Sequence, residues 1–197
     1  MSDRPTAEDL FAATVADHRD AVALLDAGHC EAVTALADAV LSAWHGGGRL
    51  LVCGNGGSAA DAQHIVAELV GRFRAERPAY AAEALTVNMS TLTAVGNDYG
   101  FDHVFARQVE GVARPGDVLL VISTSGNSRN CILAVEAARR AGAHPFGFLG
   151  GEGGQLKSLV DGAMIAPAVD TPRIQEIHIL MGHLLCEILE IRMADRI

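Results

Sequence analysis

The chain has 197 residues, of which 50% are hydrophobic and 20% are charged, and its formal net charge is −9. This length and composition predict one soluble globular domain with a sizeable core and exclude a disordered chain. The acidic charge argues against broad binding to a DNA or RNA backbone, which requires a basic surface. No stretch approaches the roughly 20 apolar residues of a membrane-spanning helix, so we expect no membrane partner.

The cysteine pattern and the N-terminus indicate the compartment. The first ten residues, MSDRPTAEDL, lack the apolar centre of a secretory signal peptide. Cys30, Cys53, Cys131 and Cys186 are widely spaced and form neither a CxxC motif nor a disulfide framework. Since this usage is typical of a reducing environment, we expect a cytoplasmic protein.

Residues 6–45 carry apolar residues at helical spacing and no strand pattern. A break at Asp26–Ala27–Gly28 divides them into two predicted helices, and Gly46–Gly47–Gly48 ends the second. We therefore expect residues 1–46 to form a helical extension. It would pack on the rest of the domain or on an adjacent subunit.

From residue 49 onwards, predicted strands alternate with predicted helices. The strands are predicted at 49–53, 84–88, 117–122, 144–149 and 162–167, and the helices at 58–73, 90–97, 101–113, 128–141, 155–160 and 171–193. The run 117–122, DVLLVI, is apolar on both faces, which is typical of a central parallel strand. The alternation predicts an α/β fold over a single domain, residues 1–197. The expected form is a three-layer α-β-α sandwich with a central, mostly parallel five-stranded sheet.

A glycine-rich turn, GNGGS at residues 54–58, follows the first predicted strand and opens a helix. Backbone N–H groups at the N-terminus of a helix bind anions, phosphate above all. Ser58, with Asp61 three residues later, predicts a side-chain cap for this helix. His64 and Glu68 are four residues apart, so they share one helical face and are suitable zinc ligands.

A second polar turn, STSGNS at residues 123–128, follows the strand 117–122. It has neither the lysine of a P-loop nor the spacing of the dinucleotide fingerprint. Its hydroxyl and backbone N–H groups can bind a phosphate without lysine. Ligands of an open α/β sheet lie beyond the carboxyl ends of the strands, so the two turns together predict a phosphorylated small-molecule ligand.

These turns resemble those of the sugar isomerase (SIS) family. Four motifs extend the resemblance to the bacterial phosphoheptose isomerases over nearly the whole chain. The motifs are CGNGGSAADAQHIVAEL at 53–69, the pair Asn97–Asp98, GDVLLVISTSGNS at 116–128 and RIQEIHILMGH at 173–183. The resemblance implies an aldose–ketose isomerase that converts sedoheptulose 7-phosphate to D-glycero-D-manno-heptose 7-phosphate through an enediol. This reaction is the first step of activated heptose biosynthesis.

The resemblance also assigns roles to individual residues. It implies that Glu68 and His183 are the catalytic acid/base pair. The implied ligands of one zinc ion per active site are His64, Glu68, Gln175 and His183. The implied substrate-binding residues are Asn55, Gly56, Gly57, Ser58, Glu68, Asn97, Asp98, Ser123, Thr124, Ser125, Ser128 and Gln175. It further implies a homotetramer with active sites at subunit boundaries.

The helical spacing of the implied ligands bears on the zinc site. Gln175 and His183 are eight residues apart, which is about 12 Å along a helix. Contribution from two subunits is therefore the easier geometry, and because glutamine is a weak zinc ligand we expect loosely held metal. We interpret His178 as structural. Some family members have an Asp where this chain has Pro172, so whether Asp170 or Arg173 assists catalysis stays open.

Two other functions stay open. Some SIS relatives are non-catalytic modules that bind a phosphosugar or a protein, for example the bacterial replication initiator. Those relatives lack the His/Glu pair and the C-terminal His, which this chain has as His64, Glu68 and His183. Alternatively, the chain is an isomerase of another ketose phosphate. Turnover of a ketose phosphate separates the catalytic functions from the binding function.

Overall fold

The computed structural model describes residues 4–194, so residues 1–3 and 195–197 of the expected single domain lie outside the described range. One five-stranded sheet has the order β2-β1-β3-β4-β5, and every neighbouring pair is parallel. The strands are β1 (Leu50–Gly54), β2 (Ala82–Ala84), β3 (Val118–Ser123), β4 (His144–Gly150) and β5 (Gly162–Ala166). The α-helices are α1 (Ala7–Ala23), α2 (Ala27–His45), α3 (Gly57–Val70), α4 (Met89–Tyr99), α5 (Ala106–Val112), α6 (Arg129–Arg140) and α7 (Thr171–Ala194), with short 3-10 helices η1 (Phe101–His103) and η2 (Gln155–Ser158).

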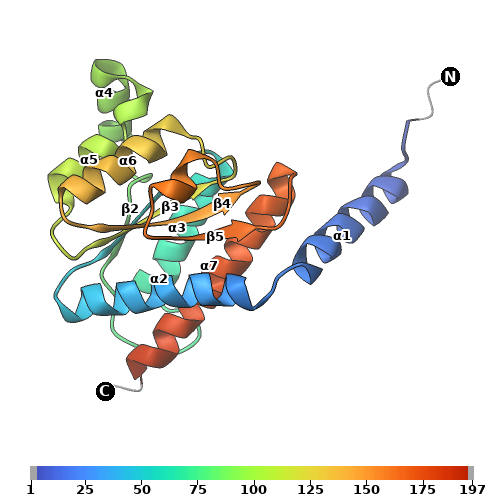
Figure 1. Ribbon diagram of the computed structural model, residues 1–197, viewed down its shortest axis with the longest axis horizontal. Helices are drawn as coiled ribbons and strands as arrows, with labels where there is room; N and C mark the ends of the chain where they lie inside the picture. The colour runs from blue at the N-terminus through green and yellow to red at the C-terminus, as the bar shows by residue number, and fades with distance from the viewer. Residues whose placement is uncertain (1–3, 195–197) are drawn as a thin grey trace.

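Helices cover both faces of the sheet, so the predicted three-layer sandwich is confirmed (Figure 1). α2, α3 and α7 pack on one face, and α5 and α6 pack on the other. Successive residues of β1 alternate between these two cores: Leu50 faces the first and Leu51 the second. All residues of β1 and β3 are buried, because both strands are covered on both faces.

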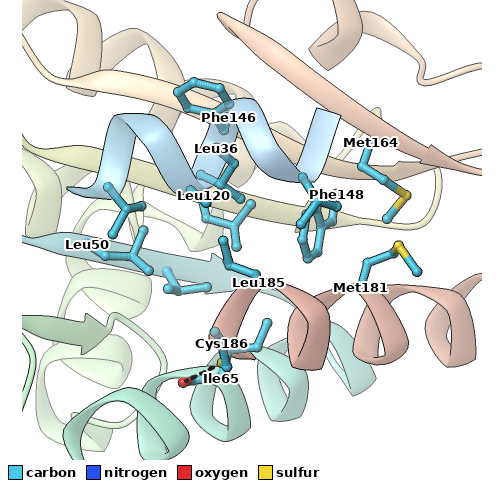
Figure 2. Close-up of a cluster of buried hydrophobic side chains, with 14 of the residues drawn as sticks. Leu36, Leu50, Ile65, Leu120, Phe146, Phe148, Met164, Met181, Leu185 and Cys186 are labelled. Atoms are coloured by element: carbon cyan, nitrogen blue, oxygen red, sulfur yellow. Dashed lines mark hydrogen bonds between the residues drawn. The ribbon is translucent and has the colours of Figure 1, made fainter. Parts of the chain in front are cut away.

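The larger core joins the sheet to α2 and α7 (Figure 2). Leu36 of α2, Leu120 and Phe148 of the strands and Leu185 of α7 meet there, and all are buried. Burying a side chain of this size stabilises a fold by about 1.5–3 kcal/mol. This packing fixes α7 on the sheet. Within residues 4–194, no helix is both long and apolar enough to cross a membrane.

The two N-terminal helices differ in their packing. α2 lies on the sheet, whereas α1 projects away from the body of the molecule (Figure 1). α1 leaves its apolar residues Leu10, Phe11 and Val15 at 55%, 72% and 51% exposure. The predicted helical extension therefore divides at residue 26. α2 belongs to the domain, and α1 has an apolar surface that none of residues 4–194 covers.

Polar side-chain contacts connect α1 with α7. His18 Nδ1 lies 2.6 Å from a carboxylate oxygen of Glu176. Arg173 donates a hydrogen bond from Nη1 to the backbone carbonyl of Thr14 at 2.9 Å. Arg173 thus orders the N-terminal helix on the domain.

Some predicted boundaries are wrong. β2 spans Ala82–Ala84 instead of 84–88, because the buried residues Leu85 and Thr86 lie in a turn that follows the strand. α4 runs past residue 97, the predicted end of this helix, through Asp98 and Tyr99, and it ends at Gly100, where φ is 87°. The predicted helix 101–113 is divided into η1 and α5. Leu85 still donates its backbone N–H to Val52 of β1 at 2.9 Å, so the apolar pattern continues past the end of the strand.

Candidate active site

Both polar turns lie at the carboxyl edge of the sheet, as predicted. We call residues 54–58 the GNGGS turn and residues 123–128 the STSGNS turn. The strands that lead into them are neighbours, and Gly54 of β1 pairs with Ile122 of β3. From β1 the chain passes to β2 on one side and then to β3 on the other, so the strand order reverses between the two turns. Open α/β sheets bind their ligands at such a point.

The GNGGS turn leads into α3 without the predicted cap. Gly56 is the N-cap residue with φ of 55°, no side chain caps the helix, and Ser58 is buried in the first turn. The Ser58–Asp61 cap was wrong because Gly56, at a φ that other residues rarely adopt, turns the chain into the helix earlier. One Asp61 carboxylate oxygen is buried without a partner, and burial raises the pKa of Asp61. The N–H groups of the first turn, uncapped by any side chain, suit a ligand.

Gln175 reaches from α7 to the first turn of α3. A Cβ atom at Gly57 would overlap the side-chain amide of Gln175, so a larger residue at position 57 would displace that amide. His64 lies seven residues further along α3, which is about 10 Å of helical rise. Gln175 therefore borders the turn that is predicted to bind sugar. Its role as a zinc ligand stays a prediction.

His64, Glu68 and His183 meet between α3 and α7. His64 Nε2 lies 3.1 Å from Glu68 Oε1 and 3.3 Å from His183 Nε2, and one ligand atom from each residue falls within 4.8 Å of the others. A tetrahedral zinc ion with bonds of about 2.0–2.1 Å holds its ligand atoms about 3.3 Å apart. Two imidazoles and one carboxylate at this spacing fit zinc. One chain brings together three of the four predicted ligands, so these three need no second subunit.

The cluster is open to solvent on one side. The side chains of His64 and Glu68 are 47% and 26% exposed. Behind them, the ring of Phe73 packs against that of His183, with centroids 5.7 Å apart. A polar ligand can therefore reach the carboxylate and both imidazoles while His183 is held in place.

A buried ion pair fixes the far ends of α3 and α7. Arg77 Nε donates to the Glu190 carboxylate at 3.2 Å, and the two side chains are only 6% and 9% exposed. Arg77 also donates to the backbone carbonyls of Glu68 at 2.6 Å and Leu69 at 2.8 Å. Sequence reasoning missed Arg77, because a single arginine in a loop carries no local signal of burial. Its contacts hold the end of the helix that presents Glu68.

The STSGNS turn borders a cavity of about 400 Å³. The cavity is lined by Thr124, Ser125, Asn127, Gly150, Gly151, Glu152, Gly154, Val169, Thr171 and Ile174. The hydroxyl oxygens of Ser123 and Ser128 lie 3.1 Å apart within the turn. None of the described residues that line the cavity is a lysine or an arginine. An anion would therefore be held by hydroxyls, amides and the N-terminus of α6.

Asn55 and Asn130 connect the GNGGS turn to the first turn of α6. Asn55 Nδ2 donates to Asn130 Oδ1, and Asn130 Nδ2 donates back to Asn55 Oδ1, both at 2.8 Å. Asn130 is only 3% exposed. Sequence reasoning missed it because the recognised motif ends at Ser128. The available signal was the amide side chain of Asn130 itself, two residues after the motif and in the first turn of α6.

Asn97 and Asp98 lie at the end of α4, away from both turns in sequence. Their exposed side chains bond to each other, with Asn97 Nδ2 donating to Asp98 Oδ1 at 2.8 Å. A second cavity, of about 420 Å³, separates α4 from the GNGGS turn and is lined by Asn55 and by Gly96 next to this pair. The structure thus places Asn97 and Asp98 beside the rim of a cavity that begins at Asn55. Their contact with substrate stays a prediction.

His178 lies on α7 between Gln175 and His183, but it faces the sheet. It is fully buried, and its Nε2 lies 2.9 Å from the backbone carbonyl oxygen of Leu149. Burial lowers the pKa of His178 to about 4, although the hydrogen bond to Leu149 acts in the opposite direction. His178 is therefore a neutral core residue, as predicted.

Comparison with known proteins places the chain in a family. A family model described as the SIS domain matches residues 15–150. A protein from Nitratiruptor named phosphoheptose isomerase is 58% identical over 142 residues, which is 72% of this chain and 76% of that protein. The chain belongs to the phosphoheptose isomerase family of SIS-domain proteins.

Solved structures of phosphoheptose isomerases share the fold. The structure from Neisseria gonorrhoeae is 42% identical, has a TM-score of 0.85 and aligns with 94% of this chain and 99% of its own. The structure from Francisella tularensis is 35% identical with a TM-score of 0.88, over the same shares of both chains. The predicted resemblance is confirmed across almost the entire phosphoheptose isomerase chain.

Proposed function

We propose that this protein is an aldose–ketose isomerase that converts sedoheptulose 7-phosphate to D-glycero-D-manno-heptose 7-phosphate, the first step of activated heptose biosynthesis. The observation that carries the proposal is the meeting of Glu68 and His183 through His64, on the helix that the GNGGS turn opens. Membership of the phosphoheptose isomerase family supports the same reaction.

The reaction requires one group for the carbon-bound proton and another for the oxygen-bound protons. Glu68 takes a proton from C1 of the ketose and returns it to C2, which passes the sugar through an enediol. His183 gives a proton to O2 and takes one from O1, because an imidazole can donate and accept near neutral pH. Atoms and charge balance, since the two steps move protons only.

We propose that the two turns divide the recognition of the substrate. The hydroxyls of Ser123, Thr124, Ser125 and Ser128 and the N-terminus of α6 hold the phosphate. The GNGGS turn, with Asn55 and the uncapped N–H groups of Gly57 and Ser58, holds sugar hydroxyls. Gln175, which borders Gly57, and the pair Asn97–Asp98 complete the substrate contacts.

We propose that His64, Glu68 and His183, with Gln175 as a fourth ligand, hold one zinc ion per site. The geometry of the first three residues supports this. A zinc ion held by these residues would supply Lewis-acid polarisation of a substrate oxygen. Loose binding is expected, since one ligand is a neutral amide and the cluster is exposed.

We further propose a cytoplasmic homotetramer with active sites near subunit boundaries. The exposed apolar residues of α1, Leu10, Phe11 and Val15, support burial against other copies of the chain. The four free cysteines support a reducing compartment.

The test is an assay of the purified protein with sedoheptulose 7-phosphate, which follows formation of the aldose with and without added zinc. Turnover is expected, and its absence under both conditions would contradict the proposal. Parallel assays with five-, six- and seven-carbon ketose phosphates test the substrate. Faster turnover of a shorter sugar would change the substrate but not the reaction class.

A further inference from the structure

Asn130 is a buried residue whose side-chain amide bonds to the amide of Asn55. It is 3% exposed, and its Oδ1 accepts hydrogen bonds from Asn55 Nδ2 at 2.8 Å and from the backbone N–H of Cys131 at 3.0 Å. Its Nδ2 donates to Asn55 Oδ1 at 2.8 Å. Buried amides with such complete bonding have one orientation.

The reciprocal pair also fixes the orientation of Asn55. A side-chain amide has two N–H groups and two oxygen lone pairs, and the pair uses one of each. If the Asn55 amide rotated by half a turn, two oxygens and two N–H groups would face each other, and both bonds would be lost. Asn130 therefore decides where the remaining donor and acceptor of Asn55 lie.

Beyond this pair, Asn55 Nδ2 lies 4.0 Å from Cys131 Sγ, and Asn55 borders space that a ligand can enter. Asn55 is half-buried and lines the cavity of about 420 Å³ beside the GNGGS turn. Asn130 belongs to the first turn of α6, and Ser128 of the STSGNS turn is the N-cap residue of the same helix. The pair thus bridges the turn at one end of the expected ligand and the helix at the other.

We propose that Asn130 is a positioning residue for the isomerisation. It orients the Asn55 amide toward the sugar and holds the GNGGS turn at a fixed distance from the phosphate-binding turn. Asn130 does not touch the substrate, and it acts through Asn55. This inference rests on the proposed function, in which Asn55 binds sugar hydroxyls.

A double-mutant cycle of Asn55→Ala and Asn130→Ala tests the inference. We expect Asn130→Ala to raise KM for sedoheptulose 7-phosphate about tenfold while kcat falls less than threefold, since hydrogen bonds of this kind are worth about 1 kcal/mol or more each. In the Asn55→Ala background, Asn130→Ala should change kcat/KM less than twofold. Asn130→Ala should lower the thermal midpoint both in the wild-type protein and in the Asn55→Ala variant. If Asn130 were only structural, Asn130→Ala would lower the thermal midpoint, but KM would not rise in a way that depends on Asn55.

Val135→Ala is the matched control, because Val135 is a fully buried residue of the same helix outside the turn. It should lower the thermal midpoint and leave KM unchanged. The inference is overturned if Asn130→Ala keeps the wild-type KM. It is also overturned if the full effect on kcat/KM persists without Asn55.

The wild-type protein separates this inference from the proposed function. If it turns over sedoheptulose 7-phosphate, the proposed function stands whatever the variants show. If it does not, the same cycle is measured as Kd for sedoheptulose 7-phosphate by calorimetry, with the same pattern expected. A wild-type protein that neither turns over nor binds this sugar would overturn both.

Discussion

His183 of α7 and His64 of α3 face each other with their Nε2 atoms 3.3 Å apart, although 119 residues separate them in the chain. The two helices run in the same direction. At the N-terminal end of α3, Gln175 of α7 borders Gly57. Beyond the C-terminal end of α3, Glu190 of α7 forms an ion pair with Arg77. This alignment places the GNGGS turn about two helical turns from the His/Glu cluster.

Removal of either histidine should weaken zinc binding. His183→Ala leaves two of the three clustered ligands, so we expect the affinity for zinc to fall at least about tenfold. Competition with a chromophoric chelator measures it. The control is His144→Ala, since His144 is exposed and lies 3.3 Å from Asp161 away from the cluster. Equal affinities of both variants would refute the zinc site.

Substitution of Glu68 tests the proton transfer. Glu68→Gln keeps the size of the side chain but removes the base, so kcat should fall about 10²- to 10⁴-fold. The assay uses saturating zinc, because Glu68 is also a proposed ligand. Calorimetry should find that binding of sedoheptulose 7-phosphate is retained. Unchanged kcat would remove Glu68 from the mechanism.

The contact between Gly57 and Gln175 gives a third test. Gly57→Ala places a Cβ atom where the Gln175 amide lies, so Gln175 must move and KM should rise about tenfold, as expected when a polar contact is lost. Gly111→Ala on α5 is the control, because no atom outside that helix lies within 4 Å of the added Cβ atom. That control should keep KM and gain about 0.5–1 kcal/mol of helix stability. If both variants keep the wild-type KM, the contact has no role in binding.

His178 predicts how stability depends on pH. Its pKa is about 4 in the folded protein against 6.5 when unperturbed, so the unfolded chain binds more protons between these values. The free energy of unfolding should therefore decrease as the pH falls from 6.5 to 4, by about 3 kcal/mol from this residue. His178→Gln keeps a donor for Leu149 and does not titrate. Urea unfolding at several pH values should show a smaller decrease for this variant, and an identical decrease would contradict the assignment.

Arg77 should stabilise the fold far more than an exposed arginine does. Arg77→Met leaves Glu190 as a buried, unpaired charge, which costs about 3–5 kcal/mol. Arg139→Met breaks an exposed pair with Asp161 and should cost about 0–1 kcal/mol. Urea denaturation of the two variants measures the difference. Similar losses in the free energy of unfolding for the two variants would show that the Arg77–Glu190 pair does not stabilise the end of α3.

The alternation of helices and strands and the two turns were predictable from the sequence because they depend on neighbours along the chain. An apolar strand such as 118–123 signals burial on both faces by its own composition. The pair His64 and Glu68 shares a helical face by spacing alone. Even the edge of the sheet at which both turns lie follows from parallel strands.

Local reasoning failed where a distant contact decides the conformation. The cap at Ser58 was the expected local choice, but Gly56 at positive φ and the approach of Gln175 to Gly57 set the start of α3. The pairs Asn55–Asn130 and Arg77–Glu190 join residues 75 and 113 positions apart in the chain. The spacing of apolar residues around these four positions does not indicate which distant residue each side chain contacts.

The sequence by itself determined the parallel α/β sheet, the positions of the two turns and the helix that carries His64 and Glu68. Only the tertiary structure decided that His183 joins them from the same chain. Side-chain packing between α3 and α7 sets this meeting. Ile65 fits against Gly182, which lacks the Cβ atom that would overlap it, and the two helices approach closely enough for the imidazoles to meet.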